Sequence, residues 1–194
     1  MKTTQLFYDS EFTGLSADSS LISIGLITPE GRGFYAEFTD YNAAQCDDWI
    51  RENVLHHCRW LSQVDLPAPF VRQQGEVTHV LGGRLQVRDA LTEWLKQFEK
   101  AEVWADCLAY DWVLLCELFG GALHLPSQLF YMPMDLATLF KIKGIDPDCD
   151  RLVFSELEQV QQHNALDDAR MARACYNKLI VLPDRSGDQQ YGYQ

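Results

Sequence analysis

The chain has 194 residues, 47% hydrophobic and 23% charged, which fits one globular core that buries roughly 70% of the unfolded chain's surface. Its formal net charge of −12 excludes a protein that grips long nucleic-acid duplexes through a broad basic surface, because phosphate neutralisation requires many Lys and Arg. No apolar run approaches the ~20 residues of a membrane span and no secretory signal pattern opens the chain, so we expect a cytoplasmic protein with no membrane partner.

Three β-rich runs come first, over residues 5–12, 21–28 and 33–38. The turn-rich stretches GLSADSS and PEGRG separate them, and this order predicts an antiparallel meander. The segment CDDWIRENVLHHC, residues 46–58, has early acidic residues and apolar residues at helical spacing, so it predicts a helix. A Pro-containing loop, LPAPF, follows it.

Helices and strands then alternate along the chain. The pattern predicts, in order, a helix over 87–100, a strand over 101–106, a helix over 110–121 with a Gly stop, a short edge strand over 129–134 that contains Pro133, and a helix over 135–142 opened by Asp135. A meander followed by helix–strand alternation implies an α/β sandwich around a mixed sheet.

The C-terminal part is predicted to be a loop over 143–154 and a long helix over 164–182. Small residues recur on one face of that helix, at Ala165, Ala169 and Ala172, with Tyr176 continuing the face. No linker divides the chain, so we expect a single domain over 1–182 and a flexible tail over 183–194.

The six cysteines, at positions 46, 58, 107, 116, 149 and 175, show no CxxC or other zinc-like spacing. Several of them fall inside apolar segments, where free thiols commonly pack. We therefore expect reduced, structural cysteines.

Asp9 and Glu11 stand two positions apart in the first predicted strand. Alternate side chains of a strand share a face, so these carboxylates project from one side, about 7 Å apart at the backbone. In a chain that is already strongly acidic, this arrangement suggests that a positive charge lies between them.

Two further carboxylates and one histidine occupy positions where they can join this pair. Asp111 opens a helix directly after a strand, at the crevice where open α/β folds place ligands. Asp168 lies in the first turns of the last helix, five residues after His163. Four converging carboxylates need a counter-charge, and their hard oxygen ligands suit a pair of Mg²⁺ or Mn²⁺ ions. His163 would then be placed to take a proton from an attacking water.

Three motifs resemble those of the DEDD 3′→5′ exonucleases: YDSEFTGL, AYDWVLL and the His-bearing HNALDDAR. The pattern is similar to the DEDDh group, and over residues 5–182 the layout resembles the small bacterial exoribonucleases of that group. The resemblance implies an RNase-H-like α/β fold with a five-stranded mixed sheet flanked by helices. It also implies that Asp9, Glu11, Asp111 and Asp168 hold two divalent cations, Mg²⁺ or Mn²⁺, and that His163 is the general base.

In this family the stretch after the Glu lines the pocket of the terminal nucleotide. The resemblance therefore implies that Phe12, Thr13, Gly14 and Leu15 approach the sugar and base, with the glycine permitting close backbone approach. Taken without the resemblance, the same stretch fits a simple turn, Asp9 and Glu11 fit a solvent-facing pair, and Asp111 fits a helix cap.

The chain departs from many relatives at Cys107, where they carry an Asn four residues before the Asp of the second motif. The substrate contacts near that position are thereby left open. The neighbouring Asp106 is an alternative ligand to Asp111, and we favour Asp111 because apolar residues follow it as the motif requires.

The leading hypothesis is a metal-dependent 3′→5′ exoribonuclease that releases 5′-mononucleotides from short or single-stranded RNA by a two-metal-ion mechanism. One alternative is a DNA 3′→5′ exonuclease with the same site, and another is a catalytically silent nucleic-acid binder on the same fold. A homodimer is a further expectation, because an acidic subunit could borrow Lys or Arg from its neighbour to hold phosphates.

Overall fold

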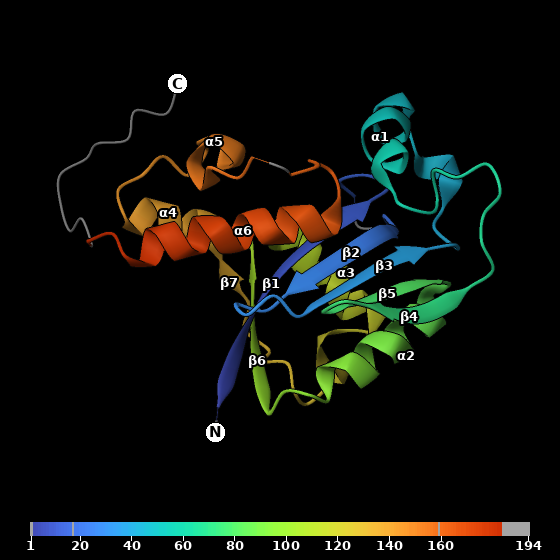
Figure 1. Cartoon of the computed structure of the whole chain (residues 1–194), viewed down its shortest axis with the longest axis horizontal. Helices are drawn as coiled ribbons and strands as arrows, with labels where there is room; N and C mark the ends of the chain where they lie inside the picture. Colours follow the sequence, from blue (N-terminus) through green and yellow to red (C-terminus); the bar gives the residue numbers. More distant parts are fainter. Residues whose placement is uncertain (1, 17, 159, 184–194) are drawn as a thin grey trace.

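A seven-stranded mixed sheet with helices on both faces forms the computed structural model of the protein, which describes residues 2–16, 18–158 and 160–183 (Figure 1). The strand order is β4-β5-β3-β2-β1-β6-β7. The strands are β1 Thr3–Phe12, β2 Leu21–Ile27, β3 Gly33–Phe38, β4 Phe70–Gln74, β5 Val77–Gly82, β6 Lys100–Ala105 and β7 Met134–Asp135. The tail predicted over 183–194 lies, beyond Pro183, outside the described residues.

Six α-helices and three short 3₁₀ turns connect or cover these strands within the described residues. The helices are α1 Asp48–Asn53, α2 Arg84–Leu95, α3 Ala109–Leu118, α4 Leu136–Ile142, α5 Arg151–Ser155 and α6 Ala165–Ile180; the 3₁₀ turns are η1 Ala43–Gln45, η2 Leu55–His57 and η3 Ala122–His124.

The predicted meander is confirmed: β1 pairs with β2, and β2 with β3, both antiparallel. β6 then lies parallel to β1 on its other side, as expected of a strand that follows a helical crossover. The predicted edge strand over 129–134 is reduced to a bridge between Leu129 and Ala101 and the two residues of β7.

The expectation of five strands is wrong, because β4 and β5 form an additional hairpin over residues 70–82. Gly75 makes its tight turn with φ +58°, and β5 pairs parallel with β3. β4 is the edge strand and four of its five residues are exposed, so its sequence, FVRQQ, lacks the alternation that marks a half-buried strand.

Three segments differ from their predicted structure. The helix predicted over 87–100 is α2, Arg84–Leu95, and Lys100 already belongs to β6. The segment 46–58 forms only α1 and the turn η2, so it is not one continuous helix. The loop predicted over 143–154 contains α5, because the carboxylate of Asp150 accepts a hydrogen bond from the backbone N of Val153 and caps the helix. Asp135 caps α4 as predicted, through the backbone N of Thr138.

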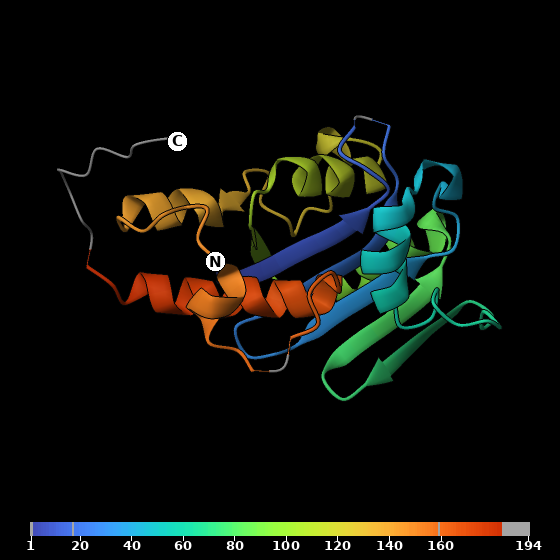
Figure 2. The same ribbon diagram turned by 90° about the horizontal axis from the view of Figure 1, so that it is seen from above.

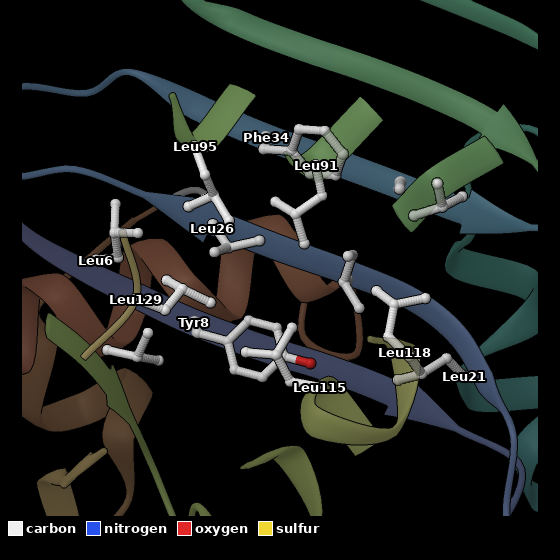
Figure 3. Packing of buried hydrophobic residues seen from close by; sticks show 14 of the residues in the cluster. Leu6, Tyr8, Leu21, Leu26, Phe34, Leu91, Leu95, Leu115, Leu118 and Leu129 are labelled. Atoms are coloured by element: carbon white, nitrogen blue, oxygen red, sulfur yellow. The ribbon is translucent and has the colours of Figure 1, made fainter. Parts of the chain in front are cut away.

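The main core lies between the sheet and the layer formed by α2 and α3. Leu6, Tyr8, Leu26 and Phe34 project from the strands toward Leu91, Leu95 and Leu115 of the two helices (Figure 3). Leu26 and Phe34 are neighbours across the β2–β3 register, so they share this face of the sheet. This burial of apolar surface fixes which face of β1 is left for α6.

The opposite face of the sheet carries α6, which crosses β1 and β2, with α1 beside its N-terminal end (Figure 2). Ala165, Ala169 and Ala172 are buried, which confirms the predicted small-residue face. The contact is closest at Gly25 of β2, where an added Cβ would lie 2.2 Å from the backbone O of Ala165 and 2.4 Å from the backbone N of Leu166. The absence of a side chain at Gly25 therefore sets how closely α6 lies on the sheet.

All six cysteines are free, as their spacing predicted. No helix in the described part of the chain combines the length and the apolar character needed to cross a membrane.

We predict that Gly25→Ala destabilises the fold by about 3 kcal/mol or more, because the atoms it would overlap are backbone atoms that no side-chain rotation can move. Urea unfolding measures the change. Gly33→Ala is the matched control: its Cβ would meet Val77 side-chain atoms at 3.2 Å, so a smaller loss is expected. Equal losses in the two variants would contradict the proposed role of Gly25.

Candidate metal centre

Three carboxylates converge where β1 passes beneath the start of α6. Each of Asp9, Glu11 and Asp168 offers an oxygen that lies within 4.8 Å of the oxygens offered by the other two. Asp9 and Glu11 share a face of β1 as predicted, and α6 places Asp168 over that face because it lies so close to β2. Residues separated by more than 150 positions in sequence thus form one cluster.

Burial and mutual repulsion act together on these groups. Burial and the charges of Asp111, Glu11 and Asp168 raise the pKa of Asp9 well above its usual value. Burial, followed by the charges of Asp168 and Asp111, raises the pKa of Glu11 from 4.5 to about 8. Burial raises the pKa of Asp168 from 3.8 to about 7, against a backbone hydrogen bond from His163. Negative charge is therefore costly here without a cation.

Asp111, in the first turn of α3, reaches β1 from the opposite side. Its Oδ1 accepts hydrogen bonds from the backbone N of Ser10 at 2.9 Å and from Ser10 Oγ at 2.6 Å. The residue is only 7% exposed, and burial raises its pKa from 3.8 to about 6 in spite of the Ser10 bonds. Asp111 is not one of the three clustered carboxylates, but its charge acts on both Asp9 and Glu11.

Asp106 is engaged elsewhere. Its Oδ2 accepts from Arg151 Nε at 2.6 Å and its Oδ1 accepts from a terminal nitrogen of the same guanidinium at 3.1 Å. Arg151 also donates to the carbonyls of Cys149 and Pro147, so the ion pair ties the loop before α5 to the end of β6. Because both of its oxygens are used, Asp106 is a poorer candidate ligand than Asp111.

His163 lies immediately before α6 in a left-handed conformation, φ +61°, which is uncommon for a residue with a side chain. Its backbone N donates to Asp168 Oδ2 at 2.8 Å, so the histidine and the carboxylate are held by one contact. Burial, followed by the charge of His57, lowers the pKa of the His163 imidazole. A neutral ring is thereby favoured, as a proton acceptor requires.

A cavity of about 220 Å³ opens beside the cluster and is lined by Asp9, Asp106, Arg151, Gln162, His163, Asp168, Met171 and Ala172. Trp49 of α1 lies at the same region, 53% exposed, with its ring edge-on to His163 at a centroid distance of 5.1 Å. The centre thus combines carboxylates, an imidazole and an accessible aromatic ring around space for a small ligand.

The hydrogen bonds that hold the start of α6 have almost no signal in the sequence. Asn164 Nδ2 donates to the Tyr35 hydroxyl and to the carbonyl of His57, both at 3.2 Å. The Tyr35 hydroxyl in turn donates to the buried carboxylate of Glu37 at 2.7 Å. The only signal in the sequence is that Asn164 adjoins His163; its partner Tyr35 lies 129 residues away.

The predicted nucleotide pocket, residues 12–15, consists of the last residue of β1, Phe12, and the start of the loop that follows it. The ring centroids of Phe12 and Tyr110 are 6.1 Å apart, and the Tyr110 hydroxyl donates a hydrogen bond to the carbonyl of Leu15. Leu15 is 74% exposed and so free to contact a ligand. Thr13 is only 2% exposed and its hydroxyl donates to Gln45 Oε1 at 2.7 Å, so its side chain supports the loop from inside.

Comparisons with known proteins show the family to which the chain belongs. A sequence model of the Rv2179c-like 3′–5′ exoribonuclease domain matches residues 4–180. Two Mycobacterium tuberculosis proteins, 3′-5′ exoribonuclease MT2234.1 of strain CDC 1551 and 3′-5′ exoribonuclease Rv2179c of strain H37Rv, are each 31% identical to this chain over 183 residues. The alignment covers 93% of this chain and 95% of each relative. The chain therefore belongs to the Rv2179c-like family of 3′–5′ exoribonucleases.

Proposed function

We propose that this protein is a metal-dependent 3′→5′ exoribonuclease of the DEDDh type, on an RNase-H-like fold, that removes 5′-mononucleotides from the 3′ end of short or single-stranded RNA. The observation that carries the proposal is the convergence of Asp9, Glu11 and Asp168, with Asp111 approaching from α3. The names of the family and of its two relatives support the exoribonuclease activity.

The residues present fit a pair of Mg²⁺ or Mn²⁺ ions. The candidate ligands are all carboxylates, which these hard cations prefer, and burial together with repulsion makes their negative charge costly unless a cation is bound. We assign Asp9, Glu11, Asp111 and Asp168 as the ligands. Bound ions would activate the attacking water and stabilise the leaving oxygen of the phosphodiester.

The protein's own groups supply the rest of the reaction. His163, held by its backbone bond to Asp168 and favoured as the neutral imidazole, accepts the proton of the attacking water. The exposed Leu15 and the partly buried Phe12 contact the base and sugar of the terminal nucleotide. Choice between RNA and DNA depends on contacts to the 2′-hydroxyl, so matched RNA and DNA ends distinguish the proposal from a DNA exonuclease.

We predict that Asp9→Asn reduces hydrolysis of a 5′-labelled oligoribonucleotide in Mg²⁺ or Mn²⁺ by more than about 100-fold, because it removes a central ligand. Gel analysis should show stepwise mononucleotide release from the 3′ end by the unaltered protein. Asp89→Asn, an exposed change on α2, is the control and should leave the rate unchanged. Stepwise RNA hydrolysis by Asp9→Asn at the unaltered rate would refute the assigned site.

His163→Ala is expected to lower the rate by about 10²- to 10⁴-fold while retaining Mn²⁺ binding, because the imidazole acts on a proton and is not a ligand. Calorimetric titration with Mn²⁺ separates the two effects. His124→Ala, in the turn η3, provides the control. Loss of Mn²⁺ uptake in His163→Ala would show that the histidine has been given the wrong role, and a fully active variant would exclude it as the base.

The unfolding free energy of the protein in chelator should fall as pH rises from about 4.5 to about 8, because folded Glu11 keeps its proton through that interval and the unfolded residue does not. Glu11→Gln has no proton to lose, so we predict that it melts at a higher temperature than the unaltered protein at pH 8 in chelator.

For a chain of this size, each kcal/mol added to the free energy of unfolding raises Tm by roughly 2–4 °C. Mn²⁺ should raise the Tm of the unaltered protein more than that of Glu11→Gln. Glu76→Gln, in the exposed β4–β5 turn, is the control for loss of one charge. A Glu11→Gln protein that melts lower than the unaltered protein in chelator at pH 8 would contradict the repulsion described for this cluster.

A further inference from the structure

Two exposed arginines, Arg59 after η2 and Arg72 on β4, form no ion pair with a described residue and share one aromatic ring as a neighbour. Both guanidinium groups lie against aromatic rings. Arg59 is 5.9 Å from the ring centroid of Trp60, and Arg72 is 5.5 Å from the same ring and 4.2 Å from that of Phe70. Two positive charges that no described carboxylate pairs with therefore lie over one buried indole, that of Trp60, which is 3% exposed.

The rings beneath these arginines form a packed cluster. The ring centroid of Trp60 lies 5.7 Å from that of Tyr35, 5.0 Å from that of Phe70 and 5.6 Å from that of His79. His79 is buried, and burial together with the charges of Arg59, Arg72 and Arg170 lowers its pKa to about 4. The three arginine charges therefore act on one small region, and the histidine beneath them is neutral.

Acidic groups near this region are already engaged. Glu37 is fully buried, and its carboxylate accepts hydrogen bonds from the Tyr35 hydroxyl and from the backbone N atoms of residues 59–61. Asp167 forms an ion pair with Arg170 at 2.6 Å. Arg170 is thereby partly neutralised, while the charges of Arg59 and Arg72 remain available to an outside anion.

The sheet register connects these arginines to the metal centre. Asp9 pairs with Gly25, Gly25 with Tyr35, Tyr35 with His79, and His79 with Arg72. Paired residues of neighbouring strands share a face, so this row lies on the α6 side of the sheet. At 4.7–4.9 Å per strand, Arg72 is about 19 Å from Asp9 and Tyr35, beneath Arg59, is about 10 Å from it.

We propose that Arg59 and Arg72 form a phosphate-binding surface for the part of the RNA substrate upstream of the scissile bond; this rests on the proposed function. The surface begins beside His163, because Asn164 bonds the carbonyl of His57, two residues before Arg59. A chain whose net charge of −12 repels polyanions needs such a local attraction to hold substrate beside its carboxylates.

The spacing makes the contribution depend on substrate length. Even at the ~3.4 Å per phosphate of a helically stacked strand, the six phosphates of a heptaribonucleotide span about 17 Å, and an unstacked strand spans more, so a heptamer can cover the roughly 19 Å from the centre to Arg72. A dinucleotide without a 5′-phosphate has its single phosphate at the metal centre and leaves both arginines without a contact. Loss of the arginines should therefore weaken the use of longer RNA only.

The test compares the double variant Arg59→Gln/Arg72→Gln with the unaltered protein on a heptaribonucleotide and on a dinucleotide without 5′-phosphate. For the heptamer we expect KM to rise roughly tenfold at 50 mM salt and the slope of log(kcat/KM) against log[salt] to become shallower by about 1.4, for two phosphate contacts. The dinucleotide parameters should stay unchanged. Arg59→Lys/Arg72→Lys, which keeps the point charges, should restore most of the slope.

Arg88→Gln/Lys96→Gln is the matched control, since it removes two positive charges from α2 and its loop on the other face of the sheet. An unchanged heptamer slope in the Arg59/Arg72 variant would overturn the inference, and so would an equal loss on the dinucleotide, which would indicate damage to the centre itself. Failure of the unaltered protein to hydrolyse either RNA would remove the proposed function and this inference with it.

Discussion

The close contact between α6 and β2 at Gly25 is the constraint on which the centre depends. β1 can present Asp9 and Glu11, but Asp168 and His163 come from the far end of the chain and reach them only because the first turn of α6 rests on bare backbone. The buried alanines of α6 continue the same close packing along the sheet. A small-residue face and one glycine thus convert two remote motifs into a single group of carboxylates.

The centre and the framework around it use buried charge in opposite ways. Glu37 is fully buried but surrounded by donors, three backbone N–H groups and a tyrosine hydroxyl, which satisfy the carboxylate from within the protein. Asp9 and Glu11 are surrounded by other carboxylates, so the fold does not satisfy them internally. The first arrangement stabilises the fold. The second leaves negative charge that no described group neutralises and that the proposed cations would neutralise.

Sequence patterns predicted the parts of the fold whose signals are local. The meander, α6 with its alanine face and the cap at Asp135 follow from alternation, helical spacing and one short side chain. The hairpin over 70–82 was missed because β4 is an exposed edge strand, and α5 because five residues are too few to show a period. Three short motifs were enough to propose the metal ligands. They were not enough to predict the hydrogen bonds that hold the backbone beside His163. Asn164 bonds Tyr35 across 129 positions, a contact that exists only after the sheet has formed.

The backbone hydrogen bond from His163 to Asp168 links two residues to which different chemical roles are assigned. Because a single hydrogen bond spans the residue assigned to the proton and the residue assigned to the cation, unwinding the first turn of α6 would displace both together. A molecule whose first turn of α6 has unwound would consequently have no hydrolytic activity, whereas a molecule with that turn intact would have full activity. The measured activity of a sample would then depend on the fraction of molecules in which the first turn of α6 is formed.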